Sequence, residues 1–347
     1  MQITLVGKRN DSLNRARGVG IYASHLYEAL VKNFSSDEYH VKYEAPYRVT
    51  SDLVHYPFFD PFFLTLPSRP KLKTVVTVHD LIPILFSEHF LVGVRGKLKW
   101  KMQLARLKRV NAVITDSTCS KEDIIRLTGI DESKIFVVPL APTQTRVTVT
   151  ISEKVRAQYQ LPRKYLLYVG DINWNKNVIG LINAFNKLEK KGLGLVLVGK
   201  ALAGPDIPEK RAIMQAIQDS PKKDQIKLLG FVPSHHLPMI YKLATLYVQP
   251  SWYEGFGLPI LEAMTQGCPV VSSSEGSLRE VGGDAVVYFD PHKGVAMKNT
   301  IHQTLSDLKL RKSMQLAGYK WFKNFSWDKV GRDTHLIYEK VISQQLN

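Results

Sequence analysis

The chain has 347 residues, 44% of them hydrophobic, which suits two domains of about 150–200 residues. Its formal net charge of +16 indicates a polyanionic partner such as nucleic acid, anionic lipid or a phosphorylated small molecule. No apolar run approaches the ~18 residues of a membrane span, and MQITLVGKRN lacks the pattern of a signal peptide. The two cysteines, Cys119 and Cys268, have neither disulfide nor metal spacing, which fits free thiols in a reducing cytoplasm, so a cytoplasmic protein is expected.

Short apolar runs alternate with helical patterns along the whole chain. The runs are rich in Val, Ile and Leu and apolar on both faces, as strands are in a parallel sheet covered by helices on both sides. Helical patterns such as 21–34, 177–191 and 235–244 separate them. This rhythm predicts a doubly wound α/β fold. The predicted strands are 3–6, 74–78, 112–115, 135–138, 165–170, 195–199, 226–232, 245–249, 269–273 and 285–289.

We expect two Rossmann-like domains, residues 1–155 and 156–327, followed by an amphipathic helix over about 328–346. The linker is expected around 141–164, which has a proline toward each end and little apolar periodicity. In open parallel sheets, ligands bind outside the carboxyl ends of the strands. Two sheets that face each other would therefore hold a ligand in the cleft between them.

The stretch SWYEGFGLPILEAM (251–264) leads from a predicted strand through a glycine-rich loop into a helix. Gly255 and Gly257 let the loop backbone approach a ligand closely, and the free N–H groups at the start of the helix suit a diphosphate. Glu262, in the first turns of the helix, can accept two hydrogen bonds from a ribose diol, while Glu254 lies on the loop beside a polar part of the ligand. The alternative is an ordinary strand–loop–helix turn, with Glu262 placed favourably for the helix dipole.

Other residues also lie where a parallel sheet presents ligand-binding groups. Lys176 follows a predicted strand and precedes a helix, where a lysine serves as a point charge for a phosphate. His79 ends another predicted strand, and the neighbouring Asp80 is placed to orient it. Gly18 and Gly20 follow the first strand and its loop. The alternatives are an exposed surface lysine, a structural histidine and a flexible loop before a helix.

The pattern E-G-F-G-L-P-x-x-E-A-M, with Glu254 and Glu262 eight residues apart, resembles the signature of family 4 glycosyltransferases, retaining enzymes of the GT-B fold. The resemblance covers most of the chain, because six further segments are similar to family motifs in the same order. It implies two Rossmann-like domains facing across a cleft, with helix 328–346 crossing back to the N-terminal domain. It also implies that the N-terminal domain binds the acceptor and the C-terminal domain binds the nucleotide sugar. The six segments are 16–30, 75–83, 115–124, 168–185, 229–241 and 272–291.

The resemblance implies which residues bind the donor and which act in catalysis. Lys176 meets the diphosphate, Glu254 positions the transferred sugar and His79 holds it, and these three are the expected catalytic residues. Many relatives carry an arginine shortly before this lysine; the chain has none there, so Lys200 is the expected substitute. The implied donor-binding residues are Gly18, Gly20, Lys176, Lys200, Val232, Glu254, Gly255, Phe256, Gly257, Leu258 and Glu262.

Residues 95–109, RGKLKWKMQLARLKR, hold seven lysines and arginines and no acid. Family members often work on lipid-linked acceptors at the cytoplasmic face of a membrane, so this run predicts peripheral contact with an anionic membrane. Its charges spread around much of a helical wheel, and a solvated basic helix is the alternative. Ser277 and Glu280 have the spacing of a capping box, for which a structural role is expected.

We therefore expect a retaining glycosyltransferase that moves a hexose from a nucleotide-diphosphate sugar to a glycan or lipid-linked glycan in polysaccharide biosynthesis. UDP-glucose is the expected donor, and a GDP-mannose-dependent mannosyltransferase is the alternative. No metal or cofactor is expected, because no cluster has metal-ligand spacing and no DxD pair occurs. Two other classes stay open: a nucleotide-sugar epimerase and a non-enzymatic nucleic-acid-binding protein. A nucleic-acid partner is not expected, because no binding module is recognisable and the charge is spread over both halves.

Overall fold

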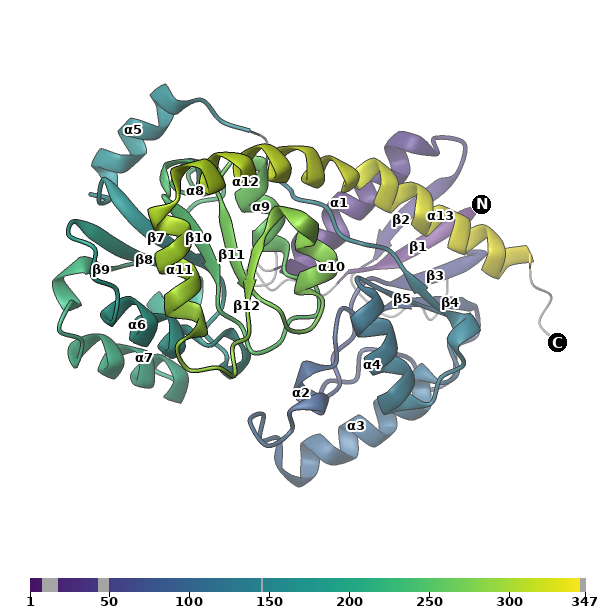
Figure 1. Ribbon diagram of the computed structural model, residues 1–347. Coiled ribbons are helices and arrows are strands. Elements are labelled where there is room, and N and C mark those ends of the chain that lie inside the picture. The colour runs from purple at the N-terminus through teal and green to yellow at the C-terminus, as the bar shows by residue number, and fades with distance from the viewer. Residues whose placement is uncertain (8–17, 43–49, 145, 344–347) are drawn as a thin grey trace. The chain divides into compact units, whose positions relative to one another are not determined.

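The protein forms two compact units, each built around its own parallel β-sheet. Unit 1 comprises Met1–Ala141 and Phe325–Asn347, and unit 2 comprises Pro142–Asn324 (Figure 1). The arrangement of the two sheets across a cleft stays a prediction. The structure is a computed structural model, and it describes residues 1–7, 18–42, 50–144 and 146–343.

Unit 1 is a doubly wound α/β unit, as the sequence predicted. Its six strands are all parallel and have the order β2-β1-β3-β4-β5-β6. The strands are β1 (Gln2–Val6), β2 (Glu38–Lys42), β3 (Leu53–Tyr56), β4 (Lys73–Thr77), β5 (Ala112–Thr115) and β6 (Ile135–Val137). The helices are α1 (Gly18–Asn33), α2 (Ile82–Leu85), α3 (Gly93–Leu107), α4 (Thr118–Thr128) and α13 (Trp327–Ser343).

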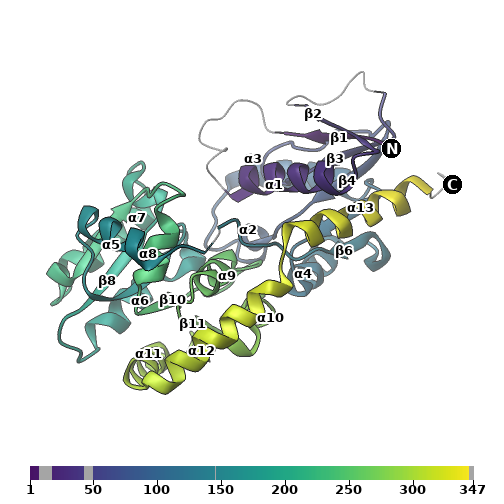
Figure 2. The same ribbon diagram turned by 90° about the horizontal axis from the view of Figure 1, so that it is seen from above.

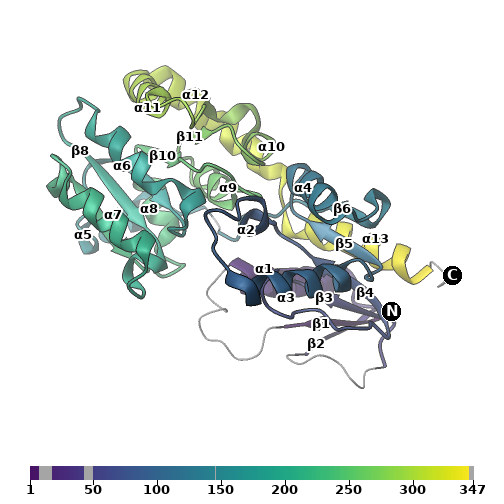
Figure 3. The ribbon, with the colours of Figure 1, turned by 90° about the horizontal axis from the view of Figure 1, so that it is seen from below.

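Helices cover both faces of the first sheet. On one face, Leu26 of α1 and Tyr338 of α13 are fully buried in a cluster that includes Ile3 of β1. On the other face, Leu107 of α3 and Ile124 of α4 are fully buried in a second cluster. The two faces can be compared in the turned views, where α1 lies nearer the viewer in Figure 2 and α3 lies nearer in Figure 3. Burial on both sides explains why these strands are apolar on both faces.

Unit 2 repeats this architecture with a second sheet of six parallel strands. Its strands are β7 (Lys164–Val169), β8 (Leu193–Val198), β9 (Ile226–Gly230), β10 (Leu246–Gln249), β11 (Val270–Ser273) and β12 (Val287–Phe289), in the order β12-β11-β10-β7-β8-β9. Its helices are α5 (Val149–Gln158), α6 (Val178–Asn186), α7 (Pro208–Gln218), α8 (Leu237–Leu243), α9 (Leu258–Thr265), α10 (Leu278–Gly282), α11 (Ala296–Ser306) and α12 (Leu308–Trp321). Helices α6, α7 and α11 bury Phe185, Ile213 and Ile301 in one core cluster, while α9 packs on β10 and β11.

The strand order of the second sheet reverses beside β7. Strands β8 and β9 continue on one side of β7, whereas β10 returns to its other side, with Leu246 opposite Leu166. The loops that leave β7 and β10 therefore start next to each other at the carboxyl edge of the sheet. In open α/β sheets such a reversal is where ligands bind.

The C-terminal helix returns to unit 1, as predicted, and a buried polar chain fixes it there. The Tyr338 hydroxyl of α13 lies 2.6 Å from Nδ1 of His55, and Nε2 of His55 lies 2.8 Å from the Thr77 hydroxyl. Burial lowers the pKa of His55 to about 3, with a smaller contribution from the charge of His79. The imidazole is therefore neutral, and each of its nitrogens has a hydrogen-bond partner.

The domain boundary differs from the one that the sequence predicted. The boundary after residue 155 falls inside α5, which packs on α8, so that unit 2 begins at Pro142. The proposed linker 141–164 thus contains a helix. Of the α5 side chains that the structure describes, only Val155 is buried, which is why the sequence shows little apolar periodicity there.

The sequence pattern also failed to predict two strands of unit 1, because they too lack a clear apolar pattern. Strand β2 exposes four of its five residues, and β3 has only four residues, one of them a histidine. Neither offers the apolar run that marks the other strands. Separately, the helices within the described ranges include none that is long and apolar enough to cross a membrane.

Removing the Tyr338 hydroxyl should weaken the docking of α13. We expect Tyr338→Phe to lower the free energy of unfolding by about 1–3 kcal/mol, because a buried His55 nitrogen loses its partner. Urea denaturation followed by circular dichroism measures the change. Tyr27→Phe, on the partly buried side of α1, is the control and should stay within about 0.5 kcal/mol. Equal losses in both variants would show that the His55 bond does not hold the helix.

Candidate active site

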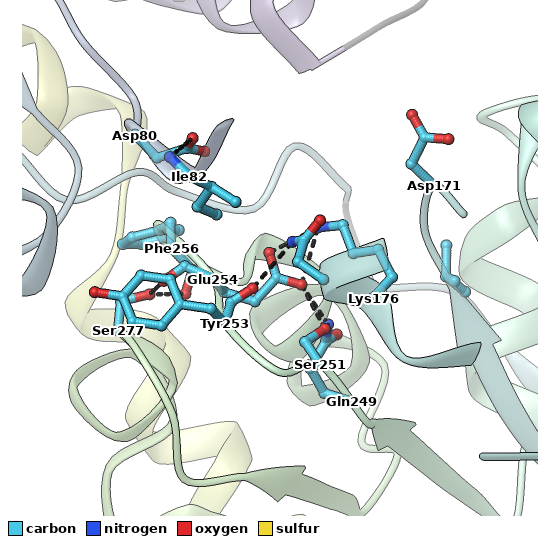
Figure 4. A network of polar contacts seen from close by, with 12 residues as sticks. Asp80, Ile82, Asp171, Lys176, Gln249, Ser251, Tyr253, Glu254, Phe256 and Ser277 are labelled. Atoms are coloured by element: carbon cyan, nitrogen blue, oxygen red, sulfur yellow. Dashed lines mark hydrogen bonds and ion pairs between the residues drawn. The ribbon is translucent and has the colours of Figure 1, made fainter. Parts of the chain in front are cut away.

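The adjacent loops that leave β7 and β10 carry an ion pair. Lys176 ends the helical turn Trp174–Lys176, and its Nζ lies 2.9 Å from Oε1 and 2.7 Å from Oε2 of Glu254 (Figure 4). The Lys176 side chain is 22% exposed and that of Glu254 only 7%. Lys176 is therefore a partly buried ion-pair partner and not an exposed surface lysine. The structure thus brings together two of the three predicted catalytic residues.

Backbone and side-chain bonds join these two loops to each other. The Asn175 side chain, 3% exposed, donates from Nδ2 to the carbonyl of Tyr253 at 3.0 Å. The Asn175 carbonyl in turn accepts from the backbone N–H of Trp252 at 2.7 Å. Because both bonds involve the residues next to the ion pair, they hold Lys176 and Glu254 at a fixed separation.

The expected capping box at Ser277 is wrong. Ser277 has a helical backbone, in place of the extended one that a capping serine needs, and its side chain makes no cap bond to α10. Its hydroxyl instead lies 3.0 Å from the carbonyl oxygen of Glu254 and 2.8 Å from that of Phe256. The preceding Gly276 has φ +62°, and a Cβ there would lie 2.5 Å from the Glu254 carbonyl oxygen. Both residues therefore support the loop that carries Glu254.

Helix α9 begins at Leu258, directly after the glycine-rich loop, as the sequence pattern indicated. Gly257 precedes it with φ +99°, and a Cβ at this position would lie 2.6 Å from Cδ2 of Leu278, so both conformation and space require glycine. Phe256 is 6% exposed and Gly255 is also buried. The N–H groups of the first turn thus lie at the carboxyl edge of the sheet. The contacts of Gly255 to Leu258 with a diphosphate stay predictions.

Glu262 is more deeply enclosed than an acid on a helix surface. It is 9% exposed, and Tyr241 of α8 donates its hydroxyl to Oε2 at 3.0 Å. Burial raises the pKa of Glu262 to about 7, although the Tyr241 hydrogen bond opposes the shift. At neutral pH the carboxyl is therefore close to half protonated. Its predicted bonds to a ribose stay a prediction.

The other predicted donor-binding residues belong to other loops and helices than Lys176 and Glu254 do. Lys200 follows β8 and Val232 follows β9, on the side of β7 away from β10. In the hydrogen bonds and ion pairs of the described residues, neither side chain reaches the pair. Gly18 and Gly20 lie in the first turn of α1 in unit 1, and the loop before them falls outside the described residues. Their contacts with a donor stay predictions.

His79 is held by a carboxylate that the sequence did not point to. Its Nδ1 lies 2.7 Å from Oδ2 of Asp116, which is 3% exposed and follows the adjacent strand β5. The predicted partner, Asp80, instead accepts from the backbone N–H of Ile82 at 3.0 Å, at the start of α2. Burial lowers the pKa of His79, but the charge and hydrogen bond of Asp116, with smaller contributions from the charge of Asp80 and a backbone hydrogen bond at Pro57, raise it above 6.5.

Sequence reasoning also missed two polar residues beside Glu254. The Gln249 amide nitrogen lies 2.8 Å and the Ser251 hydroxyl 2.7 Å from Oε1 of Glu254. Both side chains are buried. The available signal was a glutamine that ends an otherwise apolar strand, because a buried amide needs a polar partner.

The raised pKa of Glu262 predicts a pH-dependent stability difference. The native state binds this proton more tightly than the unfolded chain, so ionisation lowers the free energy of unfolding as pH rises from about 4.5 to about 7. Glu262→Gln removes this cost. Above pH 7 we expect the variant to be more stable than wild type by up to about 3 kcal/mol, and at pH 5 the difference should fall to about 1 kcal/mol.

Chemical denaturation at pH 5 and pH 8 measures this difference. Glu189→Gln, an exposed acid, is the control and should show no pH-dependent difference. If the difference for Glu262→Gln is the same at both pH values, the ionisation of Glu262 is not its cause.

Comparison with known proteins identifies the family. Residues 152–321 match the family described as Glycosyl transferases group 1, and residues 48–141 match Glycosyltransferase Family 4. The chain is 33% identical over 294 residues to the O-antigen chain mannosyltransferase B of Escherichia coli. The alignment covers 83% of this chain and 75% of that protein.

Solved structures share the two-unit fold. Sucrose-phosphate synthase from Thermosynechococcus elongatus has a TM-score of 0.79 at 20% identity, with 99% of each chain covered. Anabaena HepE in complex with UDP-glucose has a TM-score of 0.74 at 17% identity, with 99% of this chain and 100% of HepE covered. Two parallel six-stranded sheets flanked by helices, with these neighbours, make the fold GT-B. The chain belongs to glycosyltransferase family 4.

Proposed function

We propose that this glycosyltransferase moves a hexose from a nucleotide-diphosphate sugar to a hydroxyl of a glycan or lipid-linked glycan in polysaccharide biosynthesis. Unit 2 binds the donor, and unit 1 mainly binds the acceptor. The observation that carries the proposal is the Lys176–Glu254 pair, which lies at the reversal of the second sheet. The loop that carries Glu254 leads directly into α9.

The proposed chemistry is electrostatic. As the bond between sugar and phosphate lengthens, negative charge grows on the diphosphate and the sugar becomes oxocarbenium-like. Lys176 and the first N–H groups of α9 stabilise that negative charge. Glu254 accepts hydrogen bonds from the transferred sugar and positions it, and holding the sugar is the role assigned to His79. The acceptor hydroxyl attacks from the face that the diphosphate leaves and passes its proton to the departing diphosphate, so the configuration is retained. No metal or cofactor takes part.

Two donors fit this proposal, and each has support from a relative. The Escherichia coli relative is a mannosyltransferase that covers most of this chain, which favours mannose, and hence GDP-mannose. Anabaena HepE binds UDP-glucose, which keeps the donor expected from the sequence as the second candidate. We propose GDP-mannose as the first candidate, with support from the stronger sequence identity of the mannosyltransferase, 33% against 17%.

A thermal-shift screen of UDP-, GDP- and ADP-sugars tests the donor. The true donor stabilises the protein, by about 2.7 kcal/mol at one hundred times its Kd.

Substitutions of Lys176 and His79 test the assigned site. We expect Lys176→Ala to lower the affinity for the donor, measured by calorimetry, about tenfold or more, because a charged contact to phosphate is lost. His79→Ala should lower kcat and leave nucleoside-diphosphate affinity unchanged.

Transfer assays in excess EDTA complete this test. Activity that disappears with EDTA contradicts the metal-independent mechanism. Conversion of the sugar nucleotide without an acceptor supports an epimerase, and unchanged donor affinity in Lys176→Ala contradicts the assigned site.

We further propose that α3 rests on the anionic inner surface of the cytoplasmic membrane. Val94, Leu98 and Met102 are spaced four residues apart, so they share one face of the helix, and they are 84%, 59% and 40% exposed. Exposed cations, among them Lys97 and Lys101, flank this apolar face. Exposed apolar and basic side chains on one helix suit the boundary between headgroups and acyl chains of an anionic bilayer.

Vesicle sedimentation tests the membrane contact. Binding to phosphatidylglycerol vesicles should exceed binding to phosphatidylcholine vesicles. Lys97→Glu combined with Lys101→Glu should weaken it about tenfold or more, since each lysine near an anionic surface contributes about 1 kcal/mol. Lys191→Glu with Lys309→Glu, two exposed lysines of unit 2, changes the net charge equally and is the control. Equal losses in both pairs contradict docking by α3, and gel shifts that depend on Lys97 and Lys101 favour nucleic acid as the partner.

A further inference from the structure

The two carboxylate oxygens of Glu254 have unequal surroundings. Oε1 receives three donors: the Gln249 amide at 2.8 Å, the Ser251 hydroxyl at 2.7 Å and the Lys176 ammonium at 2.9 Å (Figure 4). Oε2 receives only the Lys176 ammonium, at 2.7 Å, in the hydrogen bonds of the described residues. If Lys176 leaves, Oε1 keeps two neutral donors and Oε2 becomes available.

The direction of every proton in this network can be deduced. Burial raises the pKa of Tyr247 well above 10, so its phenol stays protonated and donates to Oε1 of Gln249, in preference to the Val169 carbonyl oxygen at 3.4 Å. The Gln249 amide nitrogen must then point the other way, and its two protons go to the Ser251 oxygen and to Glu254, both at 2.8 Å. The one Ser251 proton goes to Glu254. Tyr247 thus sets the orientation of the amide.

The strand places two of these residues, and the start of the loop places the third. Tyr247 and Gln249 are two apart on β10, so they lie on the same face, and Ser251 follows two residues after the strand ends. Their exposed fractions are 0%, 2% and 0%. A buried network with all its protons used is rigid and specifies one geometry.

We propose that Gln249 and Ser251 are positioning residues that hold Glu254 by Oε1 and leave Oε2 to accept hydrogen bonds from the transferred sugar. Without donor, Lys176 and Glu254 neutralise each other across Oε2. A donor diphosphate draws the Lys176 ammonium away, and the two neutral donors continue to stabilise the negative carboxylate. The inference rests on the proposed function, in which Lys176 binds the diphosphate and Glu254 the sugar.

Substitutions at Ser251 test this assignment. We expect Ser251→Ala to lower kcat about 10- to 100-fold, because the reacting sugar loses its fixed partner. Nucleoside-diphosphate affinity should stay within about twofold, because Lys176 is untouched. Ser251→Thr keeps the hydroxyl and should restore kcat. Ser272→Ala is the control: Ser272 is also fully buried, lies on the neighbouring strand β11 and bonds only the Ser273 carbonyl among the contacts described.

A second substitution covers the amide. Gln249→Met keeps the length of the side chain and removes its donors. It should also lower kcat and leave the nucleoside-diphosphate affinity nearly unchanged. Equal losses of kcat and of Tm in Ser251→Ala and Ser272→Ala would reduce the role of Ser251 to packing. A loss of nucleoside-diphosphate affinity in step with kcat would also overturn the inference.

Donor-free crystal structures in a Lys176→Ala background separate this inference from the proposed function, because there Gln249 and Ser251 hold the Glu254 carboxylate without the ammonium. In Ser251→Ala, the Glu254 carboxylate should turn away from its wild-type position, and in Ser272→Ala it should not move. This measurement needs no turnover. An unmoved carboxylate in Ser251→Ala overturns the positioning role, whereas a wild-type protein that transfers no hexose from any donor overturns the function.

Discussion

The site depends on one pairing of strands, that of β10 with β7. It places Glu254 beside Lys176 although 78 residues separate them in the chain. The bonds of Asn175 to the 252–253 backbone follow from the same adjacency. A shift of β10 by one residue would turn Gln249 to the opposite face of the sheet. The register of the sheet, more than the local shape of either loop, therefore determines the geometry of the ion pair.

Two acids that look alike in the sequence have different environments in the structure. Glu254 is surrounded by a cation and two neutral donors, which stabilise its negative charge. Glu262 has a single phenol for a partner in the described structure, and burial favours its protonated form. The glycine-rich loop thus connects Glu254, whose carboxylate receives several hydrogen bonds, to Glu262, whose burial favours the protonated carboxyl. Ribose hydroxyls at Glu262 would supply the donors that it lacks.

Helix α5 was missed in the expected linker. The strands of unit 2 were predictable from the sequence, because most of them are buried on both faces and carry apolar runs. Strand β2 was not, since it is exposed on most of its length. The hydrogen-bond partners of the site residues were likewise hard to predict wherever no local sequence pattern marks them. Asp116 lies 37 residues from His79 in the chain, directly after the adjacent strand β5, and no local spacing reveals it. Ser277 fitted a local motif, yet its hydroxyl bonds the loop of Glu254. Local sequence patterns identified the functional groups, whereas the order of the strands determines which residues form hydrogen bonds with them.

The return of α13 to unit 1 has a consequence for biosynthesis. The first sheet and four of its helices leave the ribosome before unit 2, but the helix that covers α1 emerges only after the whole of unit 2. Until then, the apolar face that receives Val330 and Tyr338 stays open to water, and His55 lacks its hydroxyl partner. Domains generally fold in order of synthesis. Here the first unit to be made is the last to be completed, and the nascent chain carries an uncovered apolar face while unit 2 is translated.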